Sequence, residues 1–180
     1  LVTLSHPSIP KIYDYFTYDN CSYLVLEFIQ GNNLEQLIAK SQEFFPEVMV
    51  VTWAIELCDV LHFLHSHTPQ PIVFRDMKPS NVMINQYNRV VLIDFGIAKI
   101  FQTGSKGTMV GTEGYASPEQ YRGDDSPLVD IYALGATLHH LLTKRDPRLE
   151  APFTFHERKI RDVNPAISEP LVKIIEKALN

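Results

Sequence analysis

Several features that mark other protein classes are scarce in this 180-residue chain. It has two cysteines, Cys21 and Cys58, which are too few for a disulfide framework or a zinc site, so we expect both to be packing residues in a reduced compartment. The net charge is −5 and no basic run occurs, which gives no support to a nucleic-acid partner. No signal peptide and no uninterrupted apolar run of membrane-spanning length is visible. We therefore expect a cytoplasmic location and no membrane segment in this chain, which leaves room for an anchor elsewhere in a longer protein.

The glycine-rich pattern G-x-G-x-x-G is also absent. What is present is a hydrophobic content of 45%, enough over this length for one domain with a real core. The chain opens on Leu1 in the middle of a pattern, so we expect it to be a fragment.

The most informative stretch runs from Phe74 to Gly96. Two short apolar runs rich in Val and Ile, at 82–85 and 90–93, are separated by a turn-prone break and predict a β-hairpin. Polar side chains at its two ends would meet at one mouth: Asp76, Lys78, Asn81 and Asp94. Carboxylate and amide oxygens are the hard ligands that Mg²⁺ prefers, and an Asp beside a Lys near such a site suits phosphoryl transfer.

This stretch resembles the catalytic loop and the magnesium loop of eukaryotic-like (Hanks-type) serine/threonine protein kinases of the bacterial type. The family reads His-Arg-Asp-x-Lys-x-x-Asn and then Asp-Phe-Gly, and this chain has Phe74 at the histidine position. The resemblance implies that Asp76 accepts or orients the proton of the substrate hydroxyl and that Lys78 steadies the transferred γ-phosphate. It also implies that Asn81 and Asp94 hold Mg²⁺ beside ATP.

The same resemblance assigns packing roles to two aromatic residues. Phe74 would stack on Phe95 of Asp-Phe-Gly but would lack the hydrogen bond of the family histidine. Met83 would lie under the adenine ring. Lys78 is typical of kinases that act on Ser or Thr.

Residues 1–30 resemble the end of the small lobe and the hinge of a kinase. Strands are predicted at 12–16 and 22–28 around a turn. The resemblance assigns three positions to the nucleotide pocket: the gatekeeper Leu26 and the hinge residues Glu27 and Ile29. Kinases place a Gly-rich loop and an ATP-contacting Lys before this point, and neither is found here.

Residues 31–180 resemble the large lobe. Asn32 or Asn33 can cap a helix that runs through Lys40, and Pro46 opens a longer helix to about His67. That helix carries a core stripe made of Trp53, Leu57, Leu61 and Leu64. Its histidines, His62, His65 and His67, invite a metal site, but no matching carboxylate or cysteine cluster accompanies them.

Residues 97–119 match a kinase activation segment in position. Arg75, directly before the catalytic Asp, marks kinases whose segment is ordered by a phosphate that pairs with this Arg. The candidate phosphorylation sites are Thr103, Ser105, Thr108 and Thr112, with Thr108 the first choice. The alternative is an unmodified, solvated loop.

The block Gly111–Glu119 resembles the segment that seats a peptide substrate. By this resemblance Thr112 hydrogen-bonds Asp76 and Lys78, which makes it a poorer phosphorylation site. Ser117 stands where the family commonly has Ala. Glu119 would pair with an Arg late in the domain, and no match for that Arg precedes the end of the chain.

Ser126 and Pro127 are expected to cap and start a helix to about Thr143 that is apolar around most of its circumference. Asp130 lies inside it, and a buried charge needs partners. The resemblance implies that Asp130 holds the backbone of the catalytic loop; the alternative is an exposed acid in the first helical turn. Shorter helices are predicted near 155–161 and at 168–179.

The sequence therefore predicts an α+β, protein-kinase-like fold, mainly the helical large lobe with the last strands of the small lobe: catalytic loop 74–81, magnesium loop 94–96, activation segment 97–119. The implied activity is transfer of the ATP γ-phosphate to Ser or Thr of protein substrates, including self-phosphorylation in trans. The rival functions are a pseudokinase scaffold and a small-molecule phosphotransferase. We expect the isolated fragment to be inactive because half of the nucleotide cleft is missing.

Overall fold

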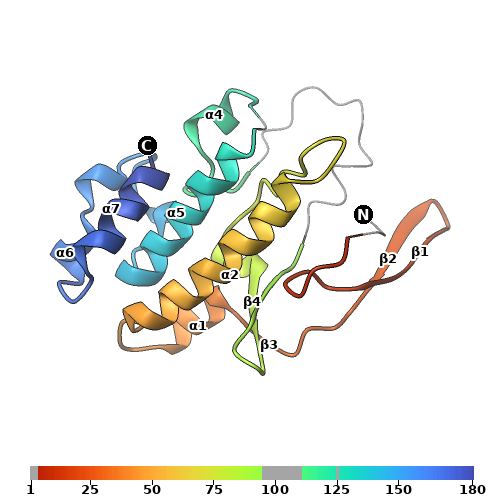
Figure 1. The fold of residues 1–180 in the computed structure, drawn as a ribbon, viewed down its shortest axis with the longest axis horizontal. Coiled ribbons are helices and arrows are strands. Elements are labelled where there is room, and N and C mark those ends of the chain that lie inside the picture. The colour runs from red at the N-terminus through yellow and green to blue at the C-terminus, as the bar shows by residue number, and fades with distance from the viewer. Residues whose placement is uncertain (1–3, 95–110, 125) are drawn as a thin grey trace.

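The computed structural model describes residues 4–94, 111–124 and 126–180, and its arrangement is an α+β fold (Figure 1). The strands are β1 (Ile12–Tyr18), β2 (Cys21–Leu26), β3 (Gly31–Asn33), β4 (Val82–Asn85) and β5 (Val90–Leu92). The helices are α1 (Leu34–Lys40), α2 (Glu47–His65), α4 (Pro118–Tyr121), α5 (Leu128–Thr143), α6 (Ile160–Val163) and α7 (Glu169–Ala178). Short 3-10 turns lie at Pro79–Asn81, Pro147–Leu149 and Phe155–Glu157.

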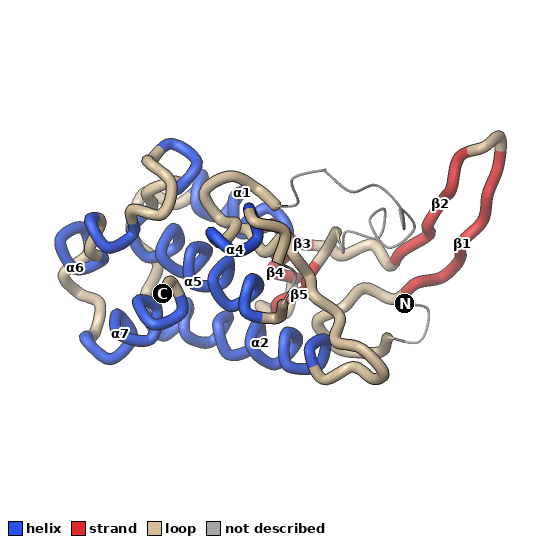
Figure 2. The backbone as a smooth tube through the Cα atoms, turned by 90° about the horizontal axis from the view of Figure 1, so that it is seen from above, coloured by secondary structure: helices blue, strands red, loops and turns tan. Residues whose placement is uncertain are grey.

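Strands β1 and β2 form an antiparallel hairpin that projects away from the helices (Figures 1 and 2). Its turn is made by Asp19 and Asn20, which both have positive φ angles, 49° and 58°. Asp and Asn tolerate this left-handed conformation better than other non-glycine residues, which explains the predicted turn. The prediction that the second strand continues to Phe28 was wrong, because β2 ends at Leu26 and Phe28 is 89% exposed.

A second antiparallel sheet has the order β3-β4-β5 and carries the predicted hairpin. Strand β3 was not predicted; it consists of Gly-Asn-Asn and pairs with β4. Gly31 is required at its start because a Cβ there would collide with the carbonyl oxygen of Ile84. The strand leads directly into α1, where Asn33 and Gln36 form a reciprocal capping box.

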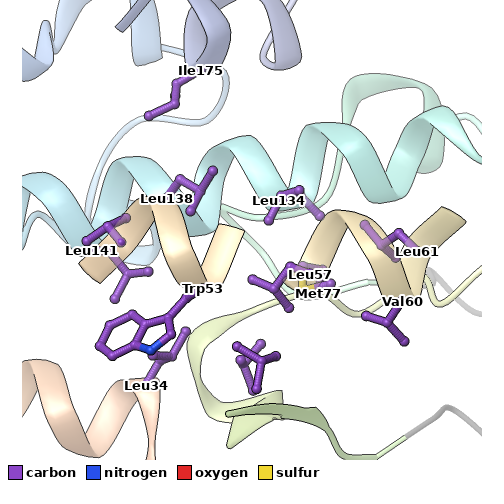
Figure 3. Close-up of a cluster of buried hydrophobic side chains, with 14 of the residues drawn as sticks. Leu34, Trp53, Leu57, Val60, Leu61, Met77, Leu134, Leu138, Leu141 and Ile175 are labelled. Atoms are coloured by element: carbon purple, nitrogen blue, oxygen red, sulfur yellow. The ribbon is translucent and has the colours of Figure 1, made fainter. Parts of the chain in front are cut away.

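Helices α2, α5 and α7 hold most of the core (Figure 3). The predicted stripe of α2 is confirmed, since its four members are at most 2% exposed: Trp53, Leu57, Leu61 and Leu64. They belong to one cluster with side chains from α5 and α7, labelled in Figure 3 as Leu134, Leu138, Leu141 and Ile175. By length and composition alone α2 could also cross a membrane, and here its inner face packs in this core.

Helix α5 is buried around nearly its whole circumference, as its apolar sequence predicted. Its predicted cap was wrong: Ser126 contributes no side-chain cap. The first turn instead uses backbone carbonyls, with the N–H groups of Val129 and Asp130 bonded to Ser126 (3.1 Å) and Pro127 (3.2 Å).

Two other predictions need correction. The segment near 155–161 is not one helix but a 3-10 turn followed by α6. Cys21 and Cys58 are both exposed, so neither is a packing residue. The predicted final helix is confirmed as α7, with Ser168 as its N-cap residue and Leu179 as its C-cap residue, and Ser168 is held by the Glu47 carboxylate at 2.6 Å.

Candidate active site

The β4–β5 hairpin brings the two polar ends of the 74–94 stretch together. The Ile93 N–H donates to the Asn81 carbonyl at 2.9 Å, which joins the end of β5 to the turn before β4. Asp94 follows immediately, exposed and with a positive φ of 57°. The structure thus sets Asp94 beside the loop that carries Asp76, Lys78 and Asn81.

The Asp76 carboxylate is the centre of this cluster. Its Oδ1 accepts the Thr112 hydroxyl at 2.6 Å, and its Oδ2 lies 3.0 Å from Lys78 Nζ and 3.1 Å from Asn81 Nδ2. Burial raises the pKa of Asp76, but these hydrogen bonds and the positive charge of Lys78 outweigh burial, so the pKa lies below its ordinary value. Asp76 is therefore ionised at neutral pH.

Thr112 connects the catalytic loop with the chain after the activation segment. Its hydroxyl donates to Asp76 and accepts a hydrogen bond from Lys78 Nζ at 2.7 Å. The structure contains both of the hydrogen bonds predicted for this residue. A hydroxyl that is used twice in this way holds Asp76 and Lys78 in one fixed relation.

Asp130 anchors the backbone of the loop that leads into Asp76. It is fully buried in α5 and accepts the backbone N–H of Phe74 (2.8 Å) and of Arg75 (2.7 Å). The predicted contact between this residue and the loop backbone is present, and the exposed alternative is wrong. Arg75 adopts a positive φ of 69°, an unfavourable conformation for a residue with a side chain, so the loop needs such an anchor.

Two further polar residues of this site were missed from the sequence. His65, at the end of α2, lies 2.8 Å from Asp130 Oδ2 through its Nε2. In the sequence, His65 invites a metal site, and nothing there indicates a contact with Asp130. Gln120, on α4, donates its side-chain Nε2–H to the Arg75 carbonyl at 2.8 Å. No local signal marks either residue, because their partners lie 65 and 45 residues away along the chain.

Ser117, the departure from the commoner Ala, has a structural use. Its hydroxyl accepts the Gln120 N–H at 3.2 Å and caps α4. Glu119, on the same short helix, is exposed.

Phe74, which stands at the histidine position of the family, is only 3% exposed. Its expected partner Phe95 lies outside the described residues.

The remaining predicted residues are spread along the strands. Leu26 ends β2 and is 37% exposed, and Glu27 accepts the Lys11 N–H through its carboxylate at 3.1 Å. Ile29 is half-buried just before β3. Met83 is half-buried on β4, where it pairs with Asn33 of β3. Thr108 lies outside the described residues, as do Gly96 and most of the predicted activation segment.

The donor set of this site fits Mg²⁺. The Asn81 side chain spends its amide nitrogen on Asp76, which leaves its oxygen as an acceptor, and Asp94 adds an exposed carboxylate. Two oxygen ligands from the protein, completed by phosphate oxygens and water, are typical of Mg²⁺ sites that serve nucleotides.

The fold and this arrangement of Asp, Lys, Asn and Asp are of the protein-kinase type. The solved structure described as the apo form of PpkA-294 has the same fold, with a TM-score of 0.75 and 24% sequence identity over 98% of this chain and 63% of that one.

The sequence comparisons then give the family. The protein kinase domain family matches residues 1–179, and this chain belongs to it. Serine/threonine-protein kinase B of Synechocystis sp. is 36% identical over 156 residues, which cover 80% of this chain and 26% of that protein. PknB of Mycobacterium leprae, a serine/threonine-protein kinase, is 32% identical over 193 residues, covering 98% and 30%. The chain thus spans well under half of the length of these relatives.

Proposed function

We propose that a protein containing this chain and a complete small lobe transfers the γ-phosphoryl group of ATP to Ser or Thr hydroxyls of proteins. The observation that carries the proposal is the Asp76 carboxylate, ionised and fixed between Thr112, Lys78 and Asn81. Phosphoryl transfer needs positioning and charge neutralisation more than covalent chemistry, and this cluster supplies both.

Asp76 is the residue that orients the substrate hydroxyl and accepts its proton. A low pKa makes a weak base, but in this reaction the proton leaves late, when the attacking oxygen has become acidic, so orientation is the main contribution. Lys78 lies 3.0 Å from the same carboxylate and places its positive charge where the transferred phosphate would pass.

Asn81 and Asp94 would hold the metal. When bound, Mg²⁺ neutralises the phosphate oxygens of ATP and so reduces the repulsion between them and an ionised Asp76. The Asn81 side-chain Nδ2 also donates to the Asp76 carboxylate at 3.1 Å and to the Asp76 backbone carbonyl at 2.9 Å, so one residue would fix the spacing of base and metal.

The nucleotide would lie between the 1–30 segment and the large lobe, 31–180. The backbone of Glu27 and Ile29 would meet the adenine edge, Leu26 would close the back of the pocket, and Met83 would form its floor. These assignments rest on the family resemblance and on the half-buried positions of Ile29 and Met83.

Regulation would act through Arg75 and the activation segment. A phosphate on Thr108, added in trans by a second copy, would pair with the Arg75 guanidinium and order the segment. Because Arg75 directly precedes Asp76, the phosphate would pair with the residue that adjoins the base.

The test is phosphate transfer from labelled ATP and Mg²⁺ to protein substrates, by a polypeptide that carries residues 1–180 and a complete small lobe. Labelled Ser or Thr, mapped by mass spectrometry and dependent on Asp94 in an Asp94→Asn variant, is the expected result. A folded protein that binds ATP without transfer would instead be a pseudokinase. Transfer to aminoglycosides but not to peptides would identify a small-molecule phosphotransferase.

A further inference from the structure

Gln120 makes a further polar contact, beside those of Thr112, between the 111–121 segment and the loop that carries Asp76. It lies on α4, is 5% exposed, and donates its side-chain Nε2–H to the Arg75 carbonyl at 2.8 Å. A carbonyl oxygen only accepts hydrogen bonds, so the end of the amide that faces it must be the nitrogen. The accepting carbonyl belongs to the peptide group that joins Arg75 to Asp76.

We propose that Gln120 is a positioning residue, which holds this peptide group and thereby fixes the direction of the Asp76 side chain. The catalytic part of this inference rests on the proposed kinase function. The geometric part concerns the conformation of the loop and can be tested without any transfer activity.

The Arg75 backbone is strained and is held from two sides. Its φ of 69° is in the left-handed region, which residues with a side chain rarely adopt unless the surroundings impose it. Asp130 of α5 binds its N–H at 2.7 Å, and Gln120 of α4 binds its carbonyl. Asp130 binds the peptide group before Arg75, whereas Gln120 binds the one after it, which leads into Asp76.

Gln120 is itself held in place. The Ser117 hydroxyl accepts its backbone N–H at 3.2 Å. Gly111, whose φ is 127°, lies close to the side-chain amide of Gln120. A Cβ added to Gly111 would approach Gln120 Nε2 to 3.0 Å. A rigid donor can impose a geometry on its acceptor, which a mobile donor cannot do.

The oxygen of the Gln120 side-chain amide points to the same role. Gln120 Oε1 is buried and has no hydrogen-bond partner among the described residues. Burying an unpaired amide oxygen costs free energy, and a Met of similar length would avoid that cost. An amide here is therefore a poor choice for packing, and its bond to Arg75 supplies a reason for it.

Together with Thr112, Gln120 gives the 111–121 segment two attachments to the catalytic loop. Thr112 binds the Asp76 side chain, and Gln120 binds the backbone just before it. In the proposed function this segment seats the substrate, so Gln120 would join the seating of substrate to the orientation of the base.

The test compares Gln120→Met with a matched control, Asn164→Leu. Asn164 is 4% exposed and also donates its side-chain amide to a backbone carbonyl, that of Leu142 at 3.0 Å, near the end of α5 opposite to Asp130. Both variants lose one buried amide-to-carbonyl bond, so general destabilisation affects both. The readouts are kcat and KM for ATP in a polypeptide with a complete small lobe, and hydrogen exchange of the backbone over residues 72–79.

We expect Gln120→Met to lower kcat tenfold or more with KM for ATP within about twofold of wild type, and to speed exchange over 72–79. Asn164→Leu should leave both unchanged at a temperature where it is folded. Equal effects of the two variants, or wild-type kcat in Gln120→Met, would overturn the proposal. If the wild type transfers no phosphate, the proposed function fails and the exchange data decide the positioning role of Gln120. Faster exchange over 72–79 in Gln120→Met would then support that role, and unchanged exchange would overturn it.

Discussion

At the scale of single residues, the site depends on how one carboxylate is held. Asp76 is partly buried, which alone would raise its pKa, yet three hydrogen-bond donors lower it, one of them the positively charged Lys78. Thr112 makes the shortest of these contacts, at 2.6 Å. Its hydroxyl is therefore the group whose removal should most directly change the titration of Asp76.

Thr112→Val removes this hydroxyl while keeping the shape of the side chain. A hydrogen bond to the ionised form is lost, so the pKa of Asp76 should rise toward its ordinary value. In the wild type the lowered pKa keeps Asp76 ionised, so transfer should decline only as the pH falls below the ordinary range of an aspartate.

In Thr112→Val that decline should begin at a higher pH, and kcat at neutral pH should fall by about tenfold, the value of one lost hydrogen bond to a charged group. The measurement is kcat/KM against pH. Thr112→Ser keeps the hydroxyl and serves as the control. An unshifted acid limb in the Val variant would contradict this account of Asp76.

At the scale of elements, the structure shows which features the sequence could predict. The β4–β5 hairpin, the Asn33 cap and the buried α5 depend on patterns within a few residues, and all three were predicted. Strand β3 was missed because Gly-Asn-Asn has low strand propensity, and it forms only by pairing with β4. His65 and Gln120 were missed for the related reason that their partners are distant in sequence.

Errors of local chemistry had a different cause. Ser126 precedes Pro127 in a typical capping pattern, yet the backbone carbonyls of both residues take the first N–H groups of α5. Cys58 lies on the outer side of α2, which the composition of the chain could not reveal. A pattern shows which residue is able to make a contact, and the tertiary structure decides which contact forms.

Gly31→Ala should disrupt the β3–β4 pairing, because the new Cβ would collide with the Ile84 carbonyl oxygen on the partner strand. We expect a loss of at least about 2 kcal/mol in the free energy of unfolding, measured with urea. Gly123→Ala is the matched control: it also adds a methyl group, at a position with open space and a φ of 90°. Gly123→Ala should lower the free energy of unfolding by only about 1 kcal/mol, because alanine is strained at this positive φ. Equal losses in the two variants would mean that the close approach at Gly31 does not matter.

At the scale of the whole molecule, burial of α5 organises the fold and also makes it sensitive to acid. His139 is 2% exposed on this helix, and its ring lies 2.7 Å from the Arg158 carbonyl. Burial, with a contribution from the nearby positive charge of Arg158, lowers the pKa of His139 from 6.5 to about 4. Between these two values the unfolded chain binds a proton that the folded protein does not bind.

The free energy of unfolding should therefore fall as the pH is lowered from 6.5 to about 4, by an amount on the order of 3 kcal/mol from this residue. His139→Gln can still donate to the Arg158 carbonyl but does not titrate. It should show a shallower loss of stability over this window in urea unfolding at several pH values. His156→Gln, which removes an exposed histidine, is the control. The same pH dependence in His139→Gln and wild type would rule out this origin of acid sensitivity.

The hairpin β1–β2 supports our prediction that residues 1–180 need further protein in order to transfer phosphate. The hairpin projects from the helices (Figure 2). Much of its aromatic surface lies in solvent, including Tyr13 at 64% and Tyr18 at 71% exposure. Exposed apolar surface of this kind marks a site of contact with further protein. Residues 1–180 by themselves are therefore expected to transfer no phosphate, whereas the same residues joined to a complete small lobe should be active.

The most direct test of the central claim is the rate of phosphate transfer by Asp76→Asn relative to the wild type, with the small lobe complete. Asp162→Asn, at an exposed acid on α6, controls for the loss of one charge. Loss of a positioned base should lower kcat by at least about 100-fold in Asp76→Asn, with ATP binding retained and Asp162→Asn unaffected. A folded Asp76→Asn protein that transfers phosphate within about threefold of the wild-type rate would contradict the assignment of Asp76 and the mechanism built on it.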